Sequence, residues 1–270
     1  MRQPFSIFFH VFIIVVAATA SSCCDGHLSF GTETAGSQSF SDTLSLSLCL
    51  SSPGGIRVLD VFVFRDTLTF PLESHVRLSG TVPRTILIPS DPGDRIAAVI
   101  ANSPKPFNIQ NIRSLENLEQ AEMYYRDDDP AFPCMSAVES ISGNHHAAQL
   151  SALLCKVEIV EINKSEEGCF EDQHLSLKGV NSHVQILRFD GFGTVETEES
   201  PSAMAHPEMI TCRLAPTQTS AVLWCYPFNG AGPSPPVIVF TALRNGVPFE
   251  RSFPLPCADR GETIYMALNI

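Results

Sequence analysis

The sequence predicts an all-β protein, and two features of its 270 residues support this prediction. The chain contains 20 prolines and 16 glycines, which interrupt it often. Between them lie many short apolar runs, as expected for strands bounded by turns rather than for helices. Only one segment has the longer apolar spacing that is typical of a helix.

The first predicted strand is TLSLSLCL, residues 43–50, in which leucine alternates with serine or cysteine. This period-2 pattern indicates a strand with one apolar face. A turn, SSPGG, follows it. The next run, from Val58 to Phe64, is apolar almost without interruption, as in a strand covered on both faces. Further strands are expected at residues 75–79, 84–89 and 95–101.

One helix is expected in SLENLEQAEMYY, with Ser114 as its N-cap and the acidic segment 127–130 at its end. Its apolar residues recur at spacings of three, three and four: Leu115, Leu118, Ala121 and Tyr125. Beyond it, LSALLCKVEIVEI predicts one long strand. The apolar phase of that strand shifts at Val160, which indicates a bulge or bend.

The polar stretch NKSEEG, residues 163–168, is the expected boundary between two domains, 42–165 and 166–270. The loop from residue 191 to residue 216 is long and acidic. Asn245-Gly246 lies between two apolar runs and predicts a hairpin. Further strands of the second domain are expected at residues 175–178, 184–189, 221–226 and 237–243 and in the C-terminal TIYMALNI, whose Ile264, Met266, Leu268 and Ile270 share one face.

The N-terminus has the pattern of an export signal. Arg2 is the only base before an apolar run from Phe5 to Ala20, whose 16 residues are fewer than the roughly 20 that a spanning helix needs. The sequence from Ala20 to Cys23 resembles a bacterial lipobox, which predicts cleavage of residues 1–22 and lipid attachment at Cys23. Cys24 fits less well, and plain secretion is the alternative.

A lipid at Cys23 would carry several acyl chains such as palmitate, and two or more chains anchor a protein stably where one does not. Residues 23–41 then form a tether.

Cleavage removes one base and no acid, so the mature chain of 248 residues has a net charge of −13 instead of −12. Such a surface repels nucleic acid, which is excluded as a main partner.

Seven cysteines lie beyond the Cys23-Cys24 pair, and in an exported chain an odd number leaves at least one thiol unpaired. Cys155 and Cys225 lie in apolar runs, so we expect them in the core. Disulfides joining Cys169 to Cys212, or Cys212 to Cys257, both remain open at this point.

No pattern of catalysis or of cofactor binding is present: the sequence has no GxSxG, P-loop, HExxH or EF-hand motif. Asp127–Asp129 and His145-His146 could contribute metal ligands, but a solvated acidic helix end and an exposed loop pair explain them better. Trp224 and Tyr226 share one strand face and could stack on a sugar, although core packing is the preferred interpretation. We therefore predict no catalytic, cofactor or metal site, and no enzyme.

The order of five segments resembles the Bacteroidales fimbrillin superfamily, the stalk, anchor and tip subunits of lipoprotein-derived pili. The segments are VLDVFVF, IAAVIAN, SLENLEQAEMYY, FPCMSA and LLCKVEIVEI, and the resemblance covers roughly Arg57 to Ile162. The lipobox and the terminal ETIYMALNI add to the resemblance. Two features depart from it: FPCMSA has no glycine after its MS, and the second half matches little.

The resemblance implies two tandem transthyretin-like β-sandwich domains, with one short helix in the first. It implies an adhesive fimbria at the outer membrane, with other fimbrial subunits as partners and a surface ligand on host or bacterium. It also implies donor-strand exchange, in which a strand of one subunit completes the sheet of the next. TLSLSLCL alternates as such a strand would, and cleavage after Arg57, the first base of the mature chain, would detach it.

Two function hypotheses remain after these arguments, and the position of TLSLSLCL has two interpretations. The leading hypothesis is a structural fimbrial subunit, an anchor or accessory subunit rather than a stalk or tip subunit. The alternative is an outer-membrane lipoprotein that binds glycan or another nutrient through Trp224 and Tyr226. TLSLSLCL is either an exchangeable strand or a plain first strand that stays permanently in its sheet.

Overall fold

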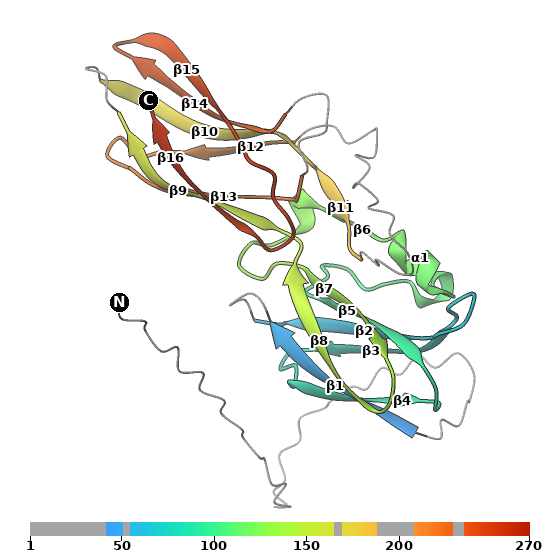
Figure 1. Cartoon of the computed structure of the whole chain (residues 1–270). Helices are drawn as coiled ribbons and strands as arrows, with labels where there is room; N and C mark the ends of the chain where they lie inside the picture. Colours follow the sequence, from blue (N-terminus) through green and yellow to red (C-terminus); the bar gives the residue numbers. More distant parts are fainter. Residues whose placement is uncertain (1–41, 51–54, 165–168, 188–207, 229–234) are drawn as a thin grey trace, which may run out of the picture. The chain divides into compact units, whose positions relative to one another are not determined.

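A computed structural model of the chain describes residues 42–50, 55–164, 169–187, 208–228 and 235–270 (Figure 1). The predicted all-β class is confirmed, because the described residues form sixteen strands and only one α-helix. Within these ranges, no helix is long and apolar enough to cross a membrane. The expected signal peptide 1–22, the lipid site Cys23 and the tether 23–41 lie outside the described residues.

The N-terminal strands form a seven-stranded sheet with the order β3-β2-β5-β7-β8-β1-β4. Strands β7 and β8 pair only at Met135–Ala152 and Ser136–Ser151, so the sheet folds over there into two layers. The strands are β1 (Asp42–Leu50), β2 (Val58–Arg65), β3 (Leu72–Ser79), β4 (Thr85–Ser90), β5 (Arg95–Ala101), β7 (Met135–Ile141) and β8 (His145–Ala152).

Apolar side chains from both layers fill the space between them, which we call the N-terminal core. Its buried members are Leu44, Leu46, Ile86, Ile88, Ala148, Leu150 and Ala152 from one layer and Leu59, Val61, Val63, Ala97, Val99, Ala101, Met135, Ala137 and Ile141 from the other. The alternation of leucine and serine predicted for the first strand therefore corresponds to one face in a sandwich core.

Strands β2 and β5 are covered on both faces, as the unbroken apolar run of β2 predicts. Leu59, Val61 and Val63 of β2 enter the N-terminal core, whereas Phe62 and Phe64 point to the opposite side. There a second cluster covers the sheet with side chains from α1 (Leu115–Glu119) and from segments further along the chain. A central strand buried on both faces has no polar face, which explains its composition.

The predicted helix is real but shorter than expected. Ser114 precedes it as predicted, although its side chain makes no capping hydrogen bond, and the helix stops at Glu119. The residues after it instead form β6 (Glu122–Tyr124), which pairs with β11 (His183–Gln185). The expectation that the helix continues to Tyr125 is therefore wrong, because strand pairing takes over this segment.

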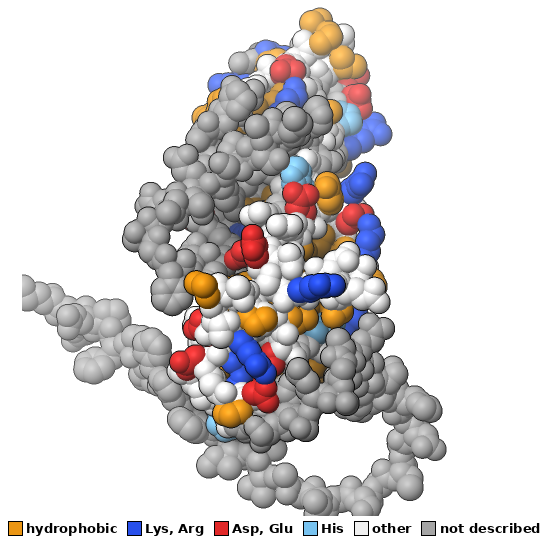
Figure 2. Space-filling view, turned by 90° about the vertical axis from the view of Figure 1, so that its right-hand side faces the viewer, with side chains coloured by type: hydrophobic (Ala, Val, Ile, Leu, Met, Phe, Trp, Pro, Cys, Tyr) orange, Lys and Arg blue, Asp and Glu red, His pale blue; other side chains and the backbone are white. Residues whose placement is uncertain are grey.

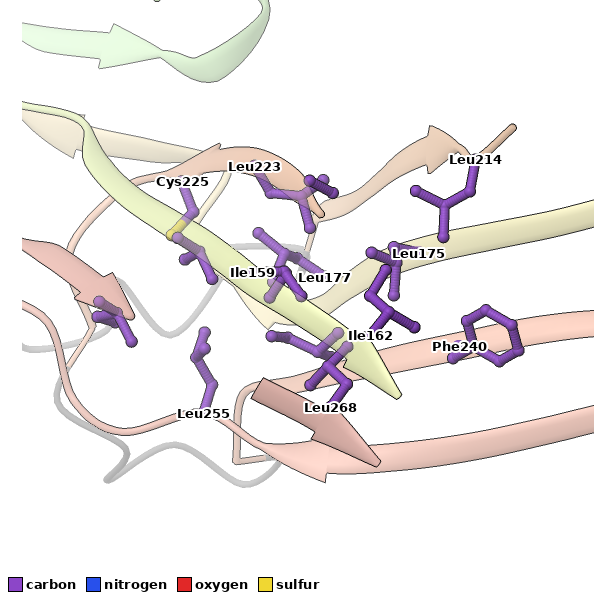
Figure 3. Close-up of a cluster of buried hydrophobic side chains, with 14 of the residues drawn as sticks. Ile159, Ile162, Leu175, Leu177, Leu214, Leu223, Cys225, Phe240, Leu255 and Leu268 are labelled. Atoms are coloured by element: carbon purple, nitrogen blue, oxygen red, sulfur yellow. The ribbon is translucent and has the colours of Figure 1, made fainter. Parts of the chain in front are cut away.

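The remaining strands form two sheets, β12-β10-β14-β15 and β13-β9-β16. They are β9 (Cys155–Asn163), β10 (Phe170–Val180), β12 (Glu208–Arg213), β13 (Ala221–Cys225), β14 (Val237–Arg244), β15 (Val247–Pro254) and β16 (Thr263–Asn269). Side chains of both sheets, such as Leu177, Leu223, Phe240 and Leu268, meet in a C-terminal core (Figure 3). This second sandwich agrees with the expected tandem arrangement.

Two local predictions in this sandwich are confirmed. Asn245 and Gly246 both have positive φ angles, 52° and 79°, and join β14 to β15 as the hairpin turn. Ile264 and Leu268 of β16 and Ile270 directly after it are buried, as the alternation of TIYMALNI predicts.

The predicted long strand is divided between the two sandwiches. β8 ends at Ala152 and pairs with β1, whereas β9 begins at Cys155 and pairs with β13 and β16. By sheet membership, the change from one sandwich to the other falls at Leu153-Leu154, before the NKSEEG segment. The expected phase shift is present, because Val160 is exposed and the pairing of β9 with β16 shifts beside it.

One further expectation needs correction, and the structure answers one question that the sequence left open. The segment 191–216 is not all loop, since β12 lies in it and pairs with β10. Neither open disulfide forms, because Cys169 and Cys212 carry free thiols. Cys155 and Cys225 are buried in the C-terminal core, as expected.

Candidate functional site

The candidate site is the groove that β1 fills in the N-terminal sandwich. β1 lies between β4, to which it is antiparallel, and β8, to which it is parallel (Figure 1). Leu44 and Leu46 have no exposed surface. Burial of two leucines contributes about 3–6 kcal/mol, so β1 is an integral part of the core rather than a loose edge.

Both sides of β1 are hydrogen-bonded. Ser45 N donates to Asn144 O at 2.7 Å, and Leu48 N donates to Arg84 O at 2.8 Å. Without β1, β4 would lose the strand that it pairs with, and β8 would lose its parallel neighbour. The vacated space would then be a groove with unpaired backbone groups and apolar walls, which an alternating strand can fill.

A short segment, residues 51–57, joins β1 to β2. Cys49 and Leu50 at the end of β1 are exposed, as is Arg57 just before β2. A cut after Arg57 would therefore leave β1 held only by noncovalent contacts. The new chain would start at Val58, the first residue of β2.

Arg57 is exposed, but both its side chain and its backbone have interaction partners. Its guanidinium carbon lies 3.2 Å from the centre of the Phe132 ring, and its Nη1 is 3.9 Å from Asp129 Oδ2. Its backbone N donates to Asn102 Oδ1 at 2.8 Å, and its carbonyl accepts from Gly80 N at 2.9 Å. Sequence reasoning found Arg57 but missed these partners, because nothing local in the sequence marks contacts from distant segments.

The three aspartates at 127–129 differ in their surroundings. Asp127 pairs with Lys105 Nζ at 3.5 Å and Asp129 pairs with Arg57, both near the surface. Asp128 is half-buried and accepts hydrogen bonds from Cys134 N at 2.9 Å and Tyr226 Oη at 3.2 Å. Burial raises the pKa of its carboxyl from 3.8 to about 6, while these hydrogen bonds lower it less. The expectation of a wholly solvated acidic end is thus wrong for Asp128.

The two histidines lie on a strand rather than in a loop. His145 and His146 begin β8, and His146 Nε2 is 3.5 Å from Glu139 Oε2. Across the ranges that the structure describes, no group of three or more His, Cys, Asp or Glu side chains is arranged to hold a metal ion.

The aromatic pair considered for sugar stacking is mostly part of the core. Tyr226 has no exposed surface, and Trp224 packs partly against the cluster on the helix side of the sheet. Burial raises the pKa of the Tyr226 hydroxyl well above its usual range, which keeps it a hydrogen-bond donor to Asp128. The preferred interpretation, core packing, is confirmed for Tyr226, so the pair cannot act as a stacking platform.

The face of the molecule in Figure 2 shows no patch of one chemical kind among the described residues. On the face in Figure 2, acidic, basic and hydrophobic side chains lie interspersed rather than gathered by type. Singly exposed apolar residues of this kind are normal on a soluble surface and do not define a site. The candidate site therefore rests on β1, which pairs with β4 and β8 and buries Leu44 and Leu46.

Comparison with known proteins supports the fold. No protein-family model matches the chain, and no curated protein matches it. Solved structures do match. A Bacteroides eggerthii protein to which cell adhesion is attributed has a TM-score of 0.61 and 14% identity, over 84% of this chain and 86% of that one.

Two fimbrial structures are similar as well. A fimbrial assembly protein from Parabacteroides distasonis has a TM-score of 0.54 and 14% identity, over 84% of this chain and 90% of that one. A fimbrilin (FimA) from Porphyromonas gingivalis has a TM-score of 0.55 and 12% identity, over 80% of this chain and 81% of that one. The chain thus has the β-sandwich fold of Bacteroidales fimbrial proteins, as the order of its segments predicts.

Proposed function

We propose that this protein is a structural, non-enzymatic subunit of a cell-surface fimbria, joined to other subunits by strand exchange and supporting adhesion. The observation that carries the proposal is β1, which fills the N-terminal core with Leu44 and Leu46 and yet is connected through exposed Arg57. One cut converts this covalent strand into an exchangeable one. A strand from another subunit can then pair with β4 and β8 and fill the same apolar pockets.

The fold likeness supports the class of protein, and the geometry of β1 supports the mechanism. The identities of 12–14% to the fimbrial structures are too low to carry a role from one protein to another. We further propose two domains, the first ending near residue 153, since sheet membership supports a boundary there.

We also propose that a lipid on Cys23 and a cut after Arg57 exclude each other in one molecule. Cys23 precedes Arg57, so the cut separates the lipid from everything that starts at Val58. An uncut chain remains at the outer membrane as an anchor or accessory subunit, which is the role we favour. A cut chain is free to serve in a stalk, or in a tip that binds a host or bacterial surface ligand.

Mass spectrometry of the N-terminus, on purified filaments and on outer membranes, tests these proposals. An acylated Cys23 in filaments supports the anchor role, and a start at Val58 supports a polymerising subunit. An acylated chain that occurs only in membranes, never with filaments, would instead favour the lipoprotein that binds glycan or another nutrient.

A further inference from the structure

The outward face of β1 is made of small polar side chains. Thr43, Ser45 and Ser47 alternate with the leucines that enter the N-terminal core, so they lie on the opposite side of the sheet. Thr43 is exposed, and the two serines are half-buried. β1 therefore packs large apolar side chains on only one of its two faces.

Leu87 of β4 is a large apolar side chain on this outward face. It alternates with Ile86 and Ile88, which are buried in the N-terminal core, and it is 67% exposed. In the pairing of β1 with β4, Leu87 lies directly opposite Ser45. The serine side chain is too short to cover the leucine, so most of Leu87 remains in contact with water.

The hydrogen-bond pattern brings positions 45 and 87 close together. Leu48 N donates to Arg84 O, so the even-numbered positions of β1 form the hydrogen-bonded pairs with β4, whereas Ser45 N donates to Asn144 O on the other side. Position 45 and Leu87 therefore form a non-hydrogen-bonded pair, the kind in which opposite side chains approach most closely. The Cβ atoms of directly opposite residues are about 4.5–5.5 Å apart, so a larger side chain at position 45 would contact Leu87.

Strand β8 supplies a second neighbour on the other side of this position. In the parallel pairing of β1 with β8, Ser45 lies opposite His145, which is exposed. The next outward position has different neighbours: Ser47 lies between Thr85 and Ala147, and its Oγ is 3.4 Å from Thr85 Oγ1. Position 45 is thus flanked by a leucine and an imidazole, whereas position 47 is flanked by a methyl group and by a hydroxyl that suits a serine.

We propose that the strand of a second fimbrial subunit that replaces β1 carries an aromatic side chain at the position of Ser45, where it packs on Leu87 and against His145. The inference rests on the proposed strand exchange and specifies the strand that is exchanged. Aromatic residues form favourable cross-strand pairs and present a large apolar surface. Such a strand fills the inner apolar pockets as β1 does and also covers Leu87. It therefore binds the groove more tightly than β1, which gives the exchange a direction.

Peptide exchange tests the inference. The full mature chain is cut after Arg57, and fluorescent peptides with acetylated and amidated ends compete with the retained β1 segment. The first peptide has the sequence 42–50 with Cys49→Ser, the second adds Ser45→Tyr, and the third instead adds Ser47→Tyr. Both tyrosine peptides carry the same residue on the same face, so they gain the same intrinsic strand preference, and only the second places the ring opposite Leu87.

The second peptide should bind about two- to tenfold more tightly than the first, and the third should gain less. Leu87→Ser, at an exposed position where folding should be unaffected, should remove most of the advantage of the second peptide over the third. The third peptide lacks the Ser47 hydroxyl in both proteins, so this comparison isolates the contact with Leu87.

Equal affinities of the two tyrosine peptides for the unsubstituted protein would overturn the inference and leave strand exchange intact. An advantage of the same size in Leu87→Ser would overturn it as well. If no peptide binds, the proposed strand exchange fails, and the inference with it.

Discussion

At the residue scale, the ring of Phe132 stacks on the guanidinium of Arg57, and we expect this contact to slow cleavage after Arg57. A protease must draw the arginine into its own pocket, and the stacked guanidinium has to leave the ring first. Phe132→Ala should therefore raise the rate of cleavage after Arg57 about two- to thirtyfold, since a cation–π contact contributes about 0.5–2 kcal/mol. Limited proteolysis followed by mass spectrometry measures the rate and the cut site.

Leu68→Ala is a suitable control for this prediction, because Leu68 is 97% exposed and its loss should leave the rate unchanged. If Phe132→Ala and Leu68→Ala are cut at the same rate as the unsubstituted chain, the stacked ring does not protect Arg57.

The surroundings of Asp128 lead to a second prediction at the residue scale, which concerns how the stability of the protein depends on pH. Its pKa rises from 3.8 to about 6 on folding, so between these values the folded state holds a proton that the unfolded state has lost. The stability that Asp128 contributes through this proton is fully present below about pH 4 and is lost as the pH rises through 6. Asp128→Asn should therefore raise the free energy of unfolding by about 1–3 kcal/mol at pH 8 and by little at pH 4.

Urea unfolding at the two pH values measures this difference. Asp127→Asn is the matched control, because the neighbouring carboxylate has only a surface ion pair with Lys105 and should contribute less than about 1 kcal/mol at either pH. If Asp128→Asn raises the free energy of unfolding equally at pH 4 and pH 8, the raised pKa assigned to Asp128 is wrong.

The sequence identified both residues but not their surroundings. Arg57 is the first base after Arg2, and Asp128 is part of an acidic triplet. The hydrogen bond from Tyr226 to Asp128 spans 98 residues along the chain. Periodicity and local motifs carry no information about such long-range contacts, so these partners could not be predicted.

At the element scale, β1 contributes buried leucines that the sandwich needs. Leu46→Ala should lower the free energy of unfolding of the uncut chain by about 2–5 kcal/mol, because the side chain is fully buried in the N-terminal core. Ser47→Ala, on the adjacent half-buried position, is the matched control. A loss below about 1 kcal/mol in urea unfolding would mean that β1 is not packed as described.

The strands with clear periodicity were predictable, and the elements that depend on distant pairing were not. TLSLSLCL, RIAAVIA and TIYMALNI each carry a pattern that their burial explains. The segment after α1 has helical spacing, but β6 pairs with β11 and Ile186 N donates to Ala121 O at 2.9 Å. Tertiary pairing outweighs a weak local helical preference there.

The division of LSALLCKVEIVEI between two strands shows the same limit of prediction from local sequence patterns. Its residues continue one apolar run, which predicts one strand. The structure assigns β8 to the sheet of β1 and β9 to the sheet of β13 and β16. Nothing in the run marks the change, because both strands need buried residues at a similar spacing.

At the scale of the whole molecule, the position of β1 makes stability depend on whether the chain is cut. In the uncut chain β1 is covalently attached, so its binding does not depend on protein concentration. After a cut at Arg57, β1 becomes a ligand of the groove between β4 and β8. A ligand that binds only the folded state adds stability by mass action, about 2.7 kcal/mol at a hundred times its Kd.

The thermal midpoint of the cut chain should therefore rise with protein concentration and with added peptide of sequence 42–50, whereas that of the uncut chain should not. Arg57→Ala exposed to the same protease is the control, since it keeps β1 attached and its midpoint should stay independent of peptide. Differential scanning fluorimetry over a peptide titration measures both. If the midpoint of the cut chain is unaffected by peptide, β1 does not leave the groove reversibly, and it is a permanent first strand rather than an exchangeable one.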